Sequence, residues 1–364
     1  MSQASHTDHQ EDLALGWFEK YIYLWIILAG AGGLLLGSLL PQLGESLERI
    51  SWQGVSLPLA VAMFFVMLPP MAKVRIGEIK HATRNIRPTA ITLVANWVIA
   101  PALMWLLATV FVPEPGYRAG IILLGLAPCT AMVLFWISFA RGNLVQGVMV
   151  TAINAVSTLF LYGILGSFYL GIGGVPVPFL LILFSSILFV GLPLVIGQFA
   201  RRSLTRMKGE AWFEGRFLKV MGDVSALALL TTMLIMFSSQ GSAILRNPLL
   251  VLRLMVPNLI HYVIMLTLAV LASRLLRLNY ADTAMTAMIS SSSQFEVAIG
   301  TAMVLFGVGS AAALATVIGP LLEIPLMVTA AKVLRRNASR FDSEPTARAM
   351  PRVAKSSRIS TRIG

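Results

Sequence analysis

Ten long apolar runs decide what this chain can fold into. Each is close to the roughly 20 residues that an α-helix needs to cross a bilayer. They lie at about 20–40, 55–72, 88–112, 118–139, 145–170, 178–200, 218–239, 249–273, 281–306 and 309–334, and the second is expected to end at Pro69-Pro70. Charged residues make up only 12% of the chain, whereas a soluble domain carries about 25%. We therefore expect an all-α integral membrane protein with ten transmembrane helices.

Basic residues are distributed unevenly between the connecting segments, and this asymmetry predicts the orientation of the chain. The connections at 73–87, 140–144, 201–219 and 274–280 hold 14 Lys and Arg, and the alternate connections hold 3. Basic loops stay on the cytoplasmic side, so the N-terminal segment 1–19 and the basic tail 335–364 are expected in the cytoplasm. The tail is expected to be disordered or to lie on anionic lipid. The net charge of +12 therefore does not indicate nucleic-acid binding.

The ten predicted spans divide into two sets of five, within 20–170 and 178–334. An odd number of spans per set places the sets in opposite orientations, as in transporters built from inverted repeats. The fourth span is interrupted by Gly125 and Pro128, and the ninth by the run at 290–294. Interrupted helices at matching positions of two halves are typical of a transporter's substrate site.

The interruption of the fourth span holds the only cysteine, Cys129. Pro128 has no amide hydrogen and its ring clashes with the carbonyl of Leu124, so the helix must open there. Opened backbone in a membrane is tolerated where it is packed in protein or lines a cavity, which predicts Cys129 at the edge of a polar cavity. The alternative is a small, inert, buried side chain. A single cysteine excludes an intrachain disulfide and any cysteine-rich metal site.

Two acidic residues lie deep within predicted spans, where a charge costs about 2.5 kcal/mol or more and is functional by default. Glu296 follows the interruption of the ninth span, and its alternative role is an ion pair with Arg253. Glu323 lies between Pro320 and Pro325, and either binds a second proton or ion or accepts hydrogen bonds from backbone amides. Because a carboxyl group in a partly dry cavity can take up a proton, Glu296 is the candidate for proton coupling.

Several other polar residues in the spans have alternative roles. His261 either relays protons or simply forms a hydrogen bond. Asn96 either lines the cavity or holds two helices together. Asp223 and Asp282 lie near span ends and are expected to be solvated. The 18 methionines are scattered, which favours packing over metal binding.

Four segments have a distinctive sequence: PPMAKVR (69–75), ANWVIAPALMW (95–105), GLAPCTAMVLFW (125–136) and FEVAIGTAMVLFGVGSAAALATVIGPLLEIPLM (295–327). Together they resemble the arsenite efflux permeases of the bile acid/sodium symporter superfamily. The likeness covers nearly all ten spans. It implies two inverted five-helix repeats that form a core bundle and a panel bundle, with discontinuous helices 4 and 9 crossing at the substrate site.

The resemblance also implies roles for individual residues. It implies that Cys129 binds arsenite and that Glu296 is the essential acidic group, which we expect to couple export to protons across the plasma membrane. Six neighbours are expected to support the site: Asn96, Pro128, Thr130, Ser293, Gln294 and Glu323. The expected partners are arsenite, antimonite, protons and the lipid bilayer, and no cofactor is expected. Many members of the family carry Arg in place of Pro128 and Asn in place of Gln294, so the selectivity for arsenite over antimonite is left open.

A lone thiol suits this chemistry, because trivalent arsenic is thiophilic and thiolates are the soft ligands of proteins. Three thiols would trap arsenite, whereas one thiol forms a single exchangeable bond. The alternative within the same fold is a sodium-coupled importer of organic anions, for which Thr130 is the only nearby ligand in the fourth span. A membrane sensor or an embedded enzyme is a third alternative, but the sequence contains no soluble output domain, no Walker A motif and no zinc-protease or hydrolase motif.

Overall fold

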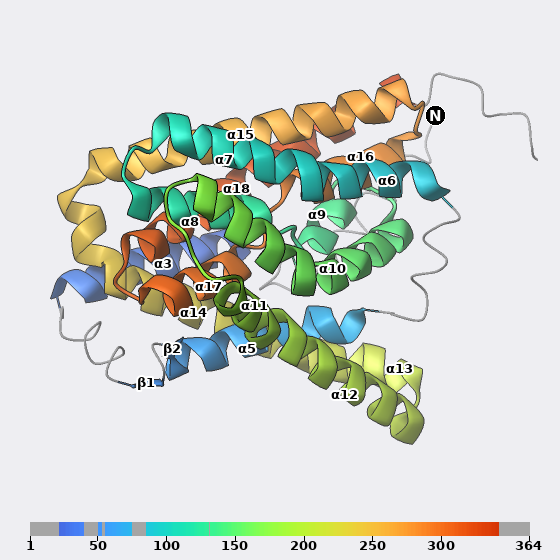
Figure 1. The fold of residues 1–364 in the computed structure, drawn as a ribbon. Coiled ribbons are helices and arrows are strands. Elements are labelled where there is room, and N and C mark those ends of the chain that lie inside the picture. The colour runs from blue at the N-terminus through green and yellow to red at the C-terminus, as the bar shows by residue number, and fades with distance from the viewer. Residues whose placement is uncertain (1–21, 40–49, 53–54, 75–84, 131, 342–364) are drawn as a thin grey trace, which may run out of the picture.

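A computed structural model describes residues 22–39, 50–52, 55–74, 85–130 and 132–341. The predictions for the N-terminal segment 1–19, for most of the connection at 73–87 and for the tail beyond Phe341 concern residues that lie outside these ranges. The described residues are almost entirely helical (Figure 1), apart from a two-stranded antiparallel hairpin of β1 (Ser51–Trp52) and β2 (Val55–Ser56).

The helices of the first half follow the predicted spans closely. They are α3 (Ile22–Leu39), α5 (Leu57–Lys73), α6 (Ile86–Val94), the π-helical turn η2 (Ala95–Ile99), α7 (Ala100–Phe111), α8 (Pro115–Leu126), α9 (Val133–Phe139) and α10 (Leu144–Ile172).

The second half has a similar series of helices. They are α11 (Phe179–Ser186), η3 (Ile187–Gly191), α12 (Leu192–Lys208), α13 (Glu210–Trp212), η4 (Phe213–Phe217), α14 (Leu218–Arg246), α15 (Pro248–Leu275), α16 (Tyr280–Ser291), α17 (Phe295–Phe306), α18 (Ala311–Arg336) and the short η5 (Ala338–Arg340).

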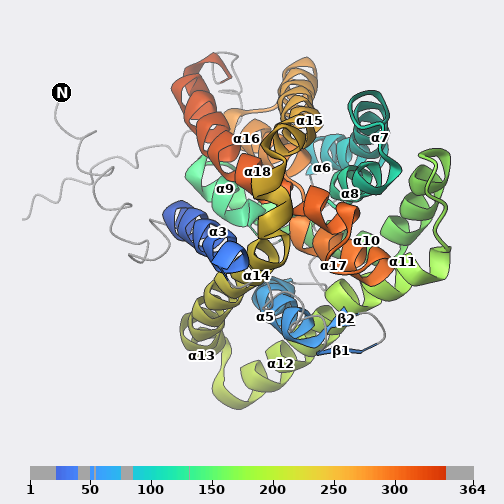
Figure 2. The ribbon, with the colours of Figure 1, turned by 90° about the vertical axis from the view of Figure 1, so that its left-hand side faces the viewer.

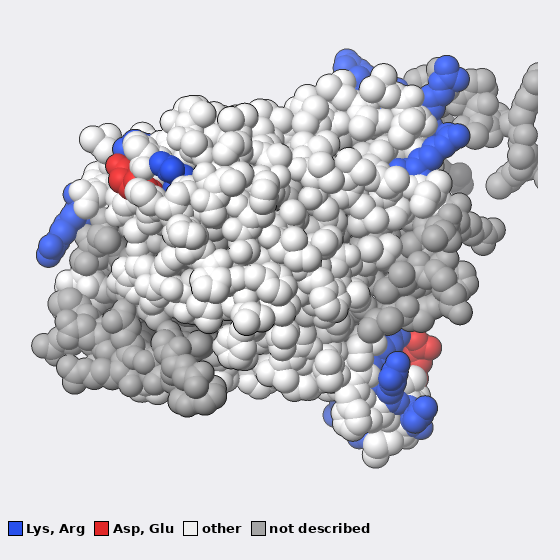
Figure 3. Space-filling model, in the orientation of Figure 1, with Lys and Arg blue, Asp and Glu red and all other residues white. Residues whose placement is uncertain are grey.

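Six helical stretches of the described residues are long and apolar enough to cross a membrane: Ile86–Phe111, Leu144–Ile172, Phe179–Lys208, Glu210–Ser239, Pro248–Leu275 and Ala311–Arg336. The other four predicted spans correspond to the shorter helices α3 and α5 and to the interrupted pairs α8/α9 and α16/α17. In Figure 3 the charged side chains lie at the two ends of the molecule, and the broad middle is without them. Large apolar side chains such as Leu180, Val195 and Phe199 are mostly exposed. An uncharged belt with exposed apolar side chains fits contact with lipid, so the chain is a multi-pass membrane protein.

The helices pack in two groups (Figure 2). The helices α3, α5, α12 and α14 form the smaller group, and the larger group consists of α6, α7, α8, α9, α10, α15, α16, α17 and α18. The stretch from α11 to α12 links the two groups, because α11 packs on α10 and α17 while α12 packs on α5. Both interrupted pairs lie in the larger group.

The prediction that the second span ends at Pro69-Pro70 is wrong, since α5 continues through both prolines to Lys73. Pro70 has no N–H to donate to the carbonyl of Val66, four residues earlier. The hydroxyl of Ser225, on α14, donates to that carbonyl at 3.0 Å. A neighbouring helix thus supplies the missing donor, which is how membrane helices tolerate proline.

The connection at 201–219 is also helical rather than a loop. Helix α12 extends to Lys208, and α13 begins at Glu210. Arg, Leu, Met and Lys are good helix formers, so the helix continues after its apolar residues end. Gly209 alone separates the two helices, with φ +85°, a left-handed conformation that glycine adopts without strain.

Asp282 is buried, contrary to the prediction that it is solvated, whereas Asp223 is exposed as predicted. The carboxylate of Asp282 accepts hydrogen bonds from the side-chain amides of Asn143 at 2.7 Å, Asn85 at 2.8 Å and Asn279 at 3.2 Å. These bonds bring together the starts of α6, α10 and α16, at the right-hand end of Figure 1. Several amide donors satisfy the buried carboxylate in place of water.

Candidate functional site

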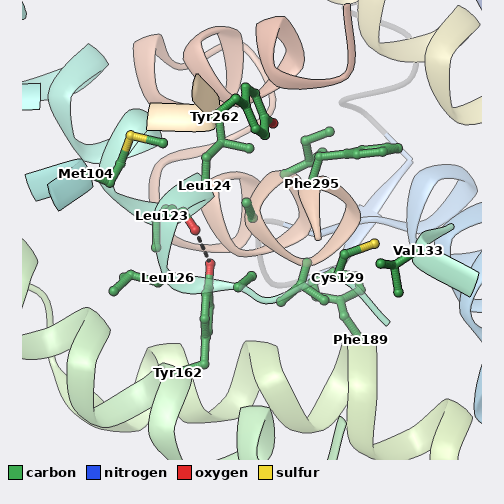
Figure 4. Close-up of a cluster of buried hydrophobic side chains, with 14 of the residues drawn as sticks. Met104, Leu123, Leu124, Leu126, Cys129, Val133, Tyr162, Phe189, Tyr262 and Phe295 are labelled. Atoms are coloured by element: carbon green, nitrogen blue, oxygen red, sulfur yellow. Dashed lines mark hydrogen bonds between the residues drawn. The ribbon is translucent and has the colours of Figure 1, made fainter. Parts of the chain in front are cut away.

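The interruption between α8 and α9 opens the backbone around Cys129. Helix α8 ends at Leu126, and Ala127 is extended with φ −104° and ψ 105°. The last carbonyls of a helix need donors from elsewhere, and the hydroxyl of Tyr162, on α10, donates to the carbonyl of Leu123 at 3.3 Å (Figure 4). Close packing holds this end of the helix in place, since a Cβ added to Gly125 would lie 2.2 Å from Cβ of Met104.

The interruption between α16 and α17 meets the first one directly. Ser293 and Pro128 form an antiparallel β-bridge. The amide of Gln294 donates to the carbonyl of Ala127 at 2.7 Å, and the amide of Cys129 donates to the carbonyl of Ser292 at 3.3 Å. Two segments about 165 residues apart in the sequence therefore satisfy each other's open backbone groups.

Cys129 is a free thiol at this junction and is only 2% exposed. It packs within the main hydrophobic core, and Figure 4 shows its sulfur next to Val133, with Phe295 and Phe189 nearby. A ligand therefore reaches the sulfur only when the packed side chains around it move apart.

A hydrogen-bonded acidic cluster adjoins the same junction. The hydroxyl of Tyr262, on α15, donates to Oε2 of Glu323 at 3.1 Å and is 3.0 Å from the hydroxyl of Ser293. The hydroxyl of Ser292 donates to Oε1 of Glu323. Glu323, on α18, is thus bonded to Ser292 directly and to Ser293 through the hydroxyl of Tyr262. Sequence reasoning missed Tyr262, although a tyrosine inside an apolar span needs a partner for its hydroxyl.

Gln294 connects the junction to the smaller helix group. Its amide nitrogen donates to the hydroxyl of Thr130 at 2.9 Å and lies 3.4 Å from the sulfur of Met67, on α5. Its amide oxygen has no hydrogen-bond partner among the described residues. Met67 therefore contacts the site. The sequence pattern indicates packing for all methionines and does not predict this contact.

Glu296 is buried in the first turn of α17, where the helix dipole favours a negative group. The alternative ion pair with Arg253 is wrong, because Arg253 binds Glu114 at 3.2 Å at the surface. Glu296 is close enough to Cys129 and Glu323 to interact with both electrostatically. Among the described residues, no Lys or Arg is buried. Two buried carboxyl groups without a buried cation beside them form a potential site for a proton or a small cation.

A small cavity of about 10 Å³ has Pro128, and not Cys129, among its lining residues, and its volume is about the room that one water molecule needs. Asn96, His261, Ser290, Ser292 and Ser293 are among its lining residues. The side-chain nitrogen of Asn96 and the hydroxyl of Ser290 have no hydrogen-bond partner among the described residues. The structure thus places Asn96 on a polar cavity wall, within the π-helical turn η2, a feature frequent at functional sites.

Comparison with known proteins identifies related chains. Residues 60–247 match the sodium bile acid symporter family. An uncharacterized transporter of Synechocystis sp. is 37% identical over 91% of this chain and 92% of its own length. Two proteins named arsenical-resistance protein Acr3 are also similar. The one from Corynebacterium glutamicum is 38% identical over 86% of this chain and 88% of its own. The one from Alkaliphilus metalliredigens is 36% identical over 91% and 96% respectively.

Proposed function

The chain belongs to the sodium bile acid symporter family, whose members are transporters rather than enzymes, and on that premise we propose that it exports arsenite in exchange for protons. The observation that carries the proposal is the position of the only thiol, Cys129, where the two interrupted helix pairs meet. The two relatives named for arsenical resistance, similar over most of their length, support arsenite as the substrate. Antimonite, with related chemistry, is the second candidate substrate.

The proposed architecture consists of ten spans in two inverted five-helix repeats, 20–170 and 178–334. The group of α3, α5, α12 and α14 would be the panel, and the larger group would be the core. The matching positions of the α8/α9 and α16/α17 interruptions support this division, because half-helices that meet near mid-membrane are how such transporters build a site. Rocking of the core against the panel would expose Cys129 to one side of the membrane at a time.

Binding to the thiol is a balanced exchange. Arsenite is the uncharged hydroxide As(OH)3 at neutral pH. The sulfur of Cys129 forms one bond to arsenic, one hydroxide leaves, and the thiol proton joins it to form water. Water reverses the reaction at release. A single sulfur ligand allows this reversal at each transport cycle.

The proposed proton carrier is Glu296, and Glu323 is the second buried carboxyl group beside the site. Facing the cytoplasm, an ionised Glu296 accepts a hydrogen bond from an arsenite hydroxyl. Facing outward, protonation removes that acceptor, weakens arsenite binding and neutralises a buried charge before the return step. Exchange of a neutral solute for one proton moves one charge inward, so the membrane potential would add about 2.3 kcal/mol per 100 mV to the driving force. The proposal includes a location in the plasma membrane, and the excess of Lys and Arg in alternate connections supports both termini in the cytoplasm.

Arsenite uptake into everted membrane vesicles tests this function. Wild-type vesicles should accumulate arsenite when their interior is acidic. Cys129→Ser should abolish this accumulation, because it replaces the sulfur ligand of arsenic by oxygen and leaves the rest of the side chain unchanged. Ala119→Ser is the matched control, since it places a buried hydroxyl in α8, the helix that precedes Cys129, away from the junction; it should transport normally. Transport by Cys129→Ser at the wild-type rate would refute the role of the thiol.

A sodium-coupled importer of organic anions is the second candidate. The family description favours it, as does the amide oxygen of Gln294, which lacks a hydrogen-bond partner among the described residues and is an oxygen ligand of the kind that hard cations prefer. The two functions are separated by their need for sodium. Arsenite accumulation in everted vesicles should persist when potassium replaces sodium, whereas a sodium-coupled importer would take up an organic anion into right-side-out vesicles only with sodium outside.

A further inference from the structure

A basic hollow lies at the end of α18, far from the junction of the interrupted helices. Its volume is about 380 Å³, and its lining residues are Arg141, Tyr280, Lys332, Arg335, Arg336 and Ala338. Four of the six carry a positive charge, and no acidic side chain is among them. A concave site with one sign of charge concentrates the opposite charge, so the hollow is suited to an anion.

The walls of the hollow are held in place by contacts between distant parts of the chain. The hydroxyl of Tyr280 donates to the carbonyl of Ala140 at 2.7 Å, which joins the start of α16 to the turn after α9. The guanidinium of Arg335 lies 5.9 Å from the ring centre of Phe139. At the end of the described chain, Phe341 contacts the ring of Tyr280 and the guanidinium of Arg274. These contacts fix the positions of Tyr280 and Arg335, and the other cationic residues of the hollow, Arg141, Lys332 and Arg336, are exposed.

The hollow lies where the apolar surface of the protein meets its charged end. Apart from Glu323 and Lys332, the residues of α18 before Arg335 are uncharged and mostly apolar, and Val333, between the cationic residues of the hollow, is half exposed. The hollow is at the same end of the molecule as the connection between α15 and α16, at the right in Figure 1. Figure 3 shows Lys and Arg side chains gathered at this end. An anion bound in the hollow would thus have exposed apolar surface beside it, as a headgroup at the membrane surface has its acyl chains.

From these observations we propose that the hollow binds the phosphate of an anionic phospholipid headgroup, with the acyl chains along the exposed apolar side of α18. Arg335 and Arg336 offer forked donors that match phosphate oxygens, and Lys332 adds a point charge. Basic pockets between membrane helices are known binding places for anionic headgroups. A free phosphate would use the same cations but would gain nothing from the adjacent apolar surface.

The test is lipid binding by the purified full-length protein in neutral detergent, counted by native mass spectrometry. Phosphatidylglycerol should bind more tightly than phosphatidylcholine. The double variant Lys332→Gln/Arg336→Gln removes two of the four charges and should weaken phosphatidylglycerol binding roughly 30-fold. Lys332→Arg/Arg336→Lys retains both charges and should bind within about threefold of wild type, which separates loss of charge from loss of fold.

The matched control is Arg202→Gln/Arg206→Gln, which removes two exposed charges from α12, outside the hollow. It should leave phosphatidylglycerol binding unchanged. If the control loses as much phosphatidylglycerol binding as the variant in the hollow, the proposed site is wrong, because lipid binding would then depend on the general surface charge of the protein. Equal binding of the two lipids would also overturn it, and so would displacement of phosphatidylglycerol by an equal concentration of glycerol 3-phosphate, which would make the hollow a site for soluble phosphates.

Discussion

The hydroxyl of Tyr262 allows the sharpest test of the acidic cluster, because Tyr262→Phe removes one oxygen atom and leaves the ring in place. That hydroxyl is buried and bonds Glu323 at 3.1 Å and Ser293 at 3.0 Å. Its removal leaves one carboxyl oxygen and one serine hydroxyl short of a partner. A buried group that loses its partner costs about 1–3 kcal/mol, and we take about 2 kcal/mol. If the arrangement that transports arsenite requires these bonds, transport should fall about 30-fold.

The assay is arsenite uptake into everted vesicles at equal protein levels. Tyr169→Phe is the matched control, since Tyr169 lies outside the acidic cluster and its ring packs at a tilt against Trp105, at 6.4 Å between ring centres. It should transport within about twofold of wild type, an effect well below the loss of a buried partner. The reasoning is refuted if Tyr262→Phe also transports within that range, or if the two variants lose the same activity.

Three further predictions concern the fold around the site. Pro128→Ala should reduce arsenite transport in vesicles more than it reduces membrane insertion measured by immunoblot, because it favours helix where the two interruptions pair; equal losses would contradict this. Ser225→Ala should lower the unfolding free energy by about 1–3 kcal/mol, because it removes the donor that compensates for Pro70, and an unchanged thermal midpoint would contradict that role. In a cysteine-free background, Met207→Cys should resist an impermeant thiol reagent in intact cells and Pro115→Cys should react; both positions are exposed, and the reverse pattern would overturn the orientation.

The sequence predicts the interruptions well because their causes are local. Proline cannot donate a hydrogen bond, so the end of α8 near Pro128 follows from one residue type. The four serines at 290–293 and Gln294 likewise predict the gap between α16 and α17. What the sequence does not contain is their mutual register. The bonds from Cys129 to Ser292 and from Gln294 to Ala127 join backbone groups far apart in the chain, and no periodic pattern specifies which groups pair.

Other differences arise where a residue's partner lies on another helix. Asp282 appears solvated from its position near a span end, but Asn85, Asn143 and Asn279 surround it in three dimensions. Helix α12 continues to Lys208, beyond the predicted end of its span, because an apolar run shows where the lipid-facing surface ends and not where the helix ends. Tyr262 was overlooked beside His261, since the sequence marks the titratable imidazole and not the hydroxyl that bonds Glu323.

X-ray absorption at the arsenic edge of the purified protein with bound arsenite shows which atoms are bonded to arsenic. If the thiol of Cys129 is the ligand of arsenic at the junction of the two interrupted helix pairs, arsenic should have one sulfur neighbour in the wild-type protein and only oxygen neighbours in Cys129→Ser. Arsenic with only oxygen neighbours in the wild-type protein, or the same sulfur signal in Cys129→Ser, would contradict this role of the thiol.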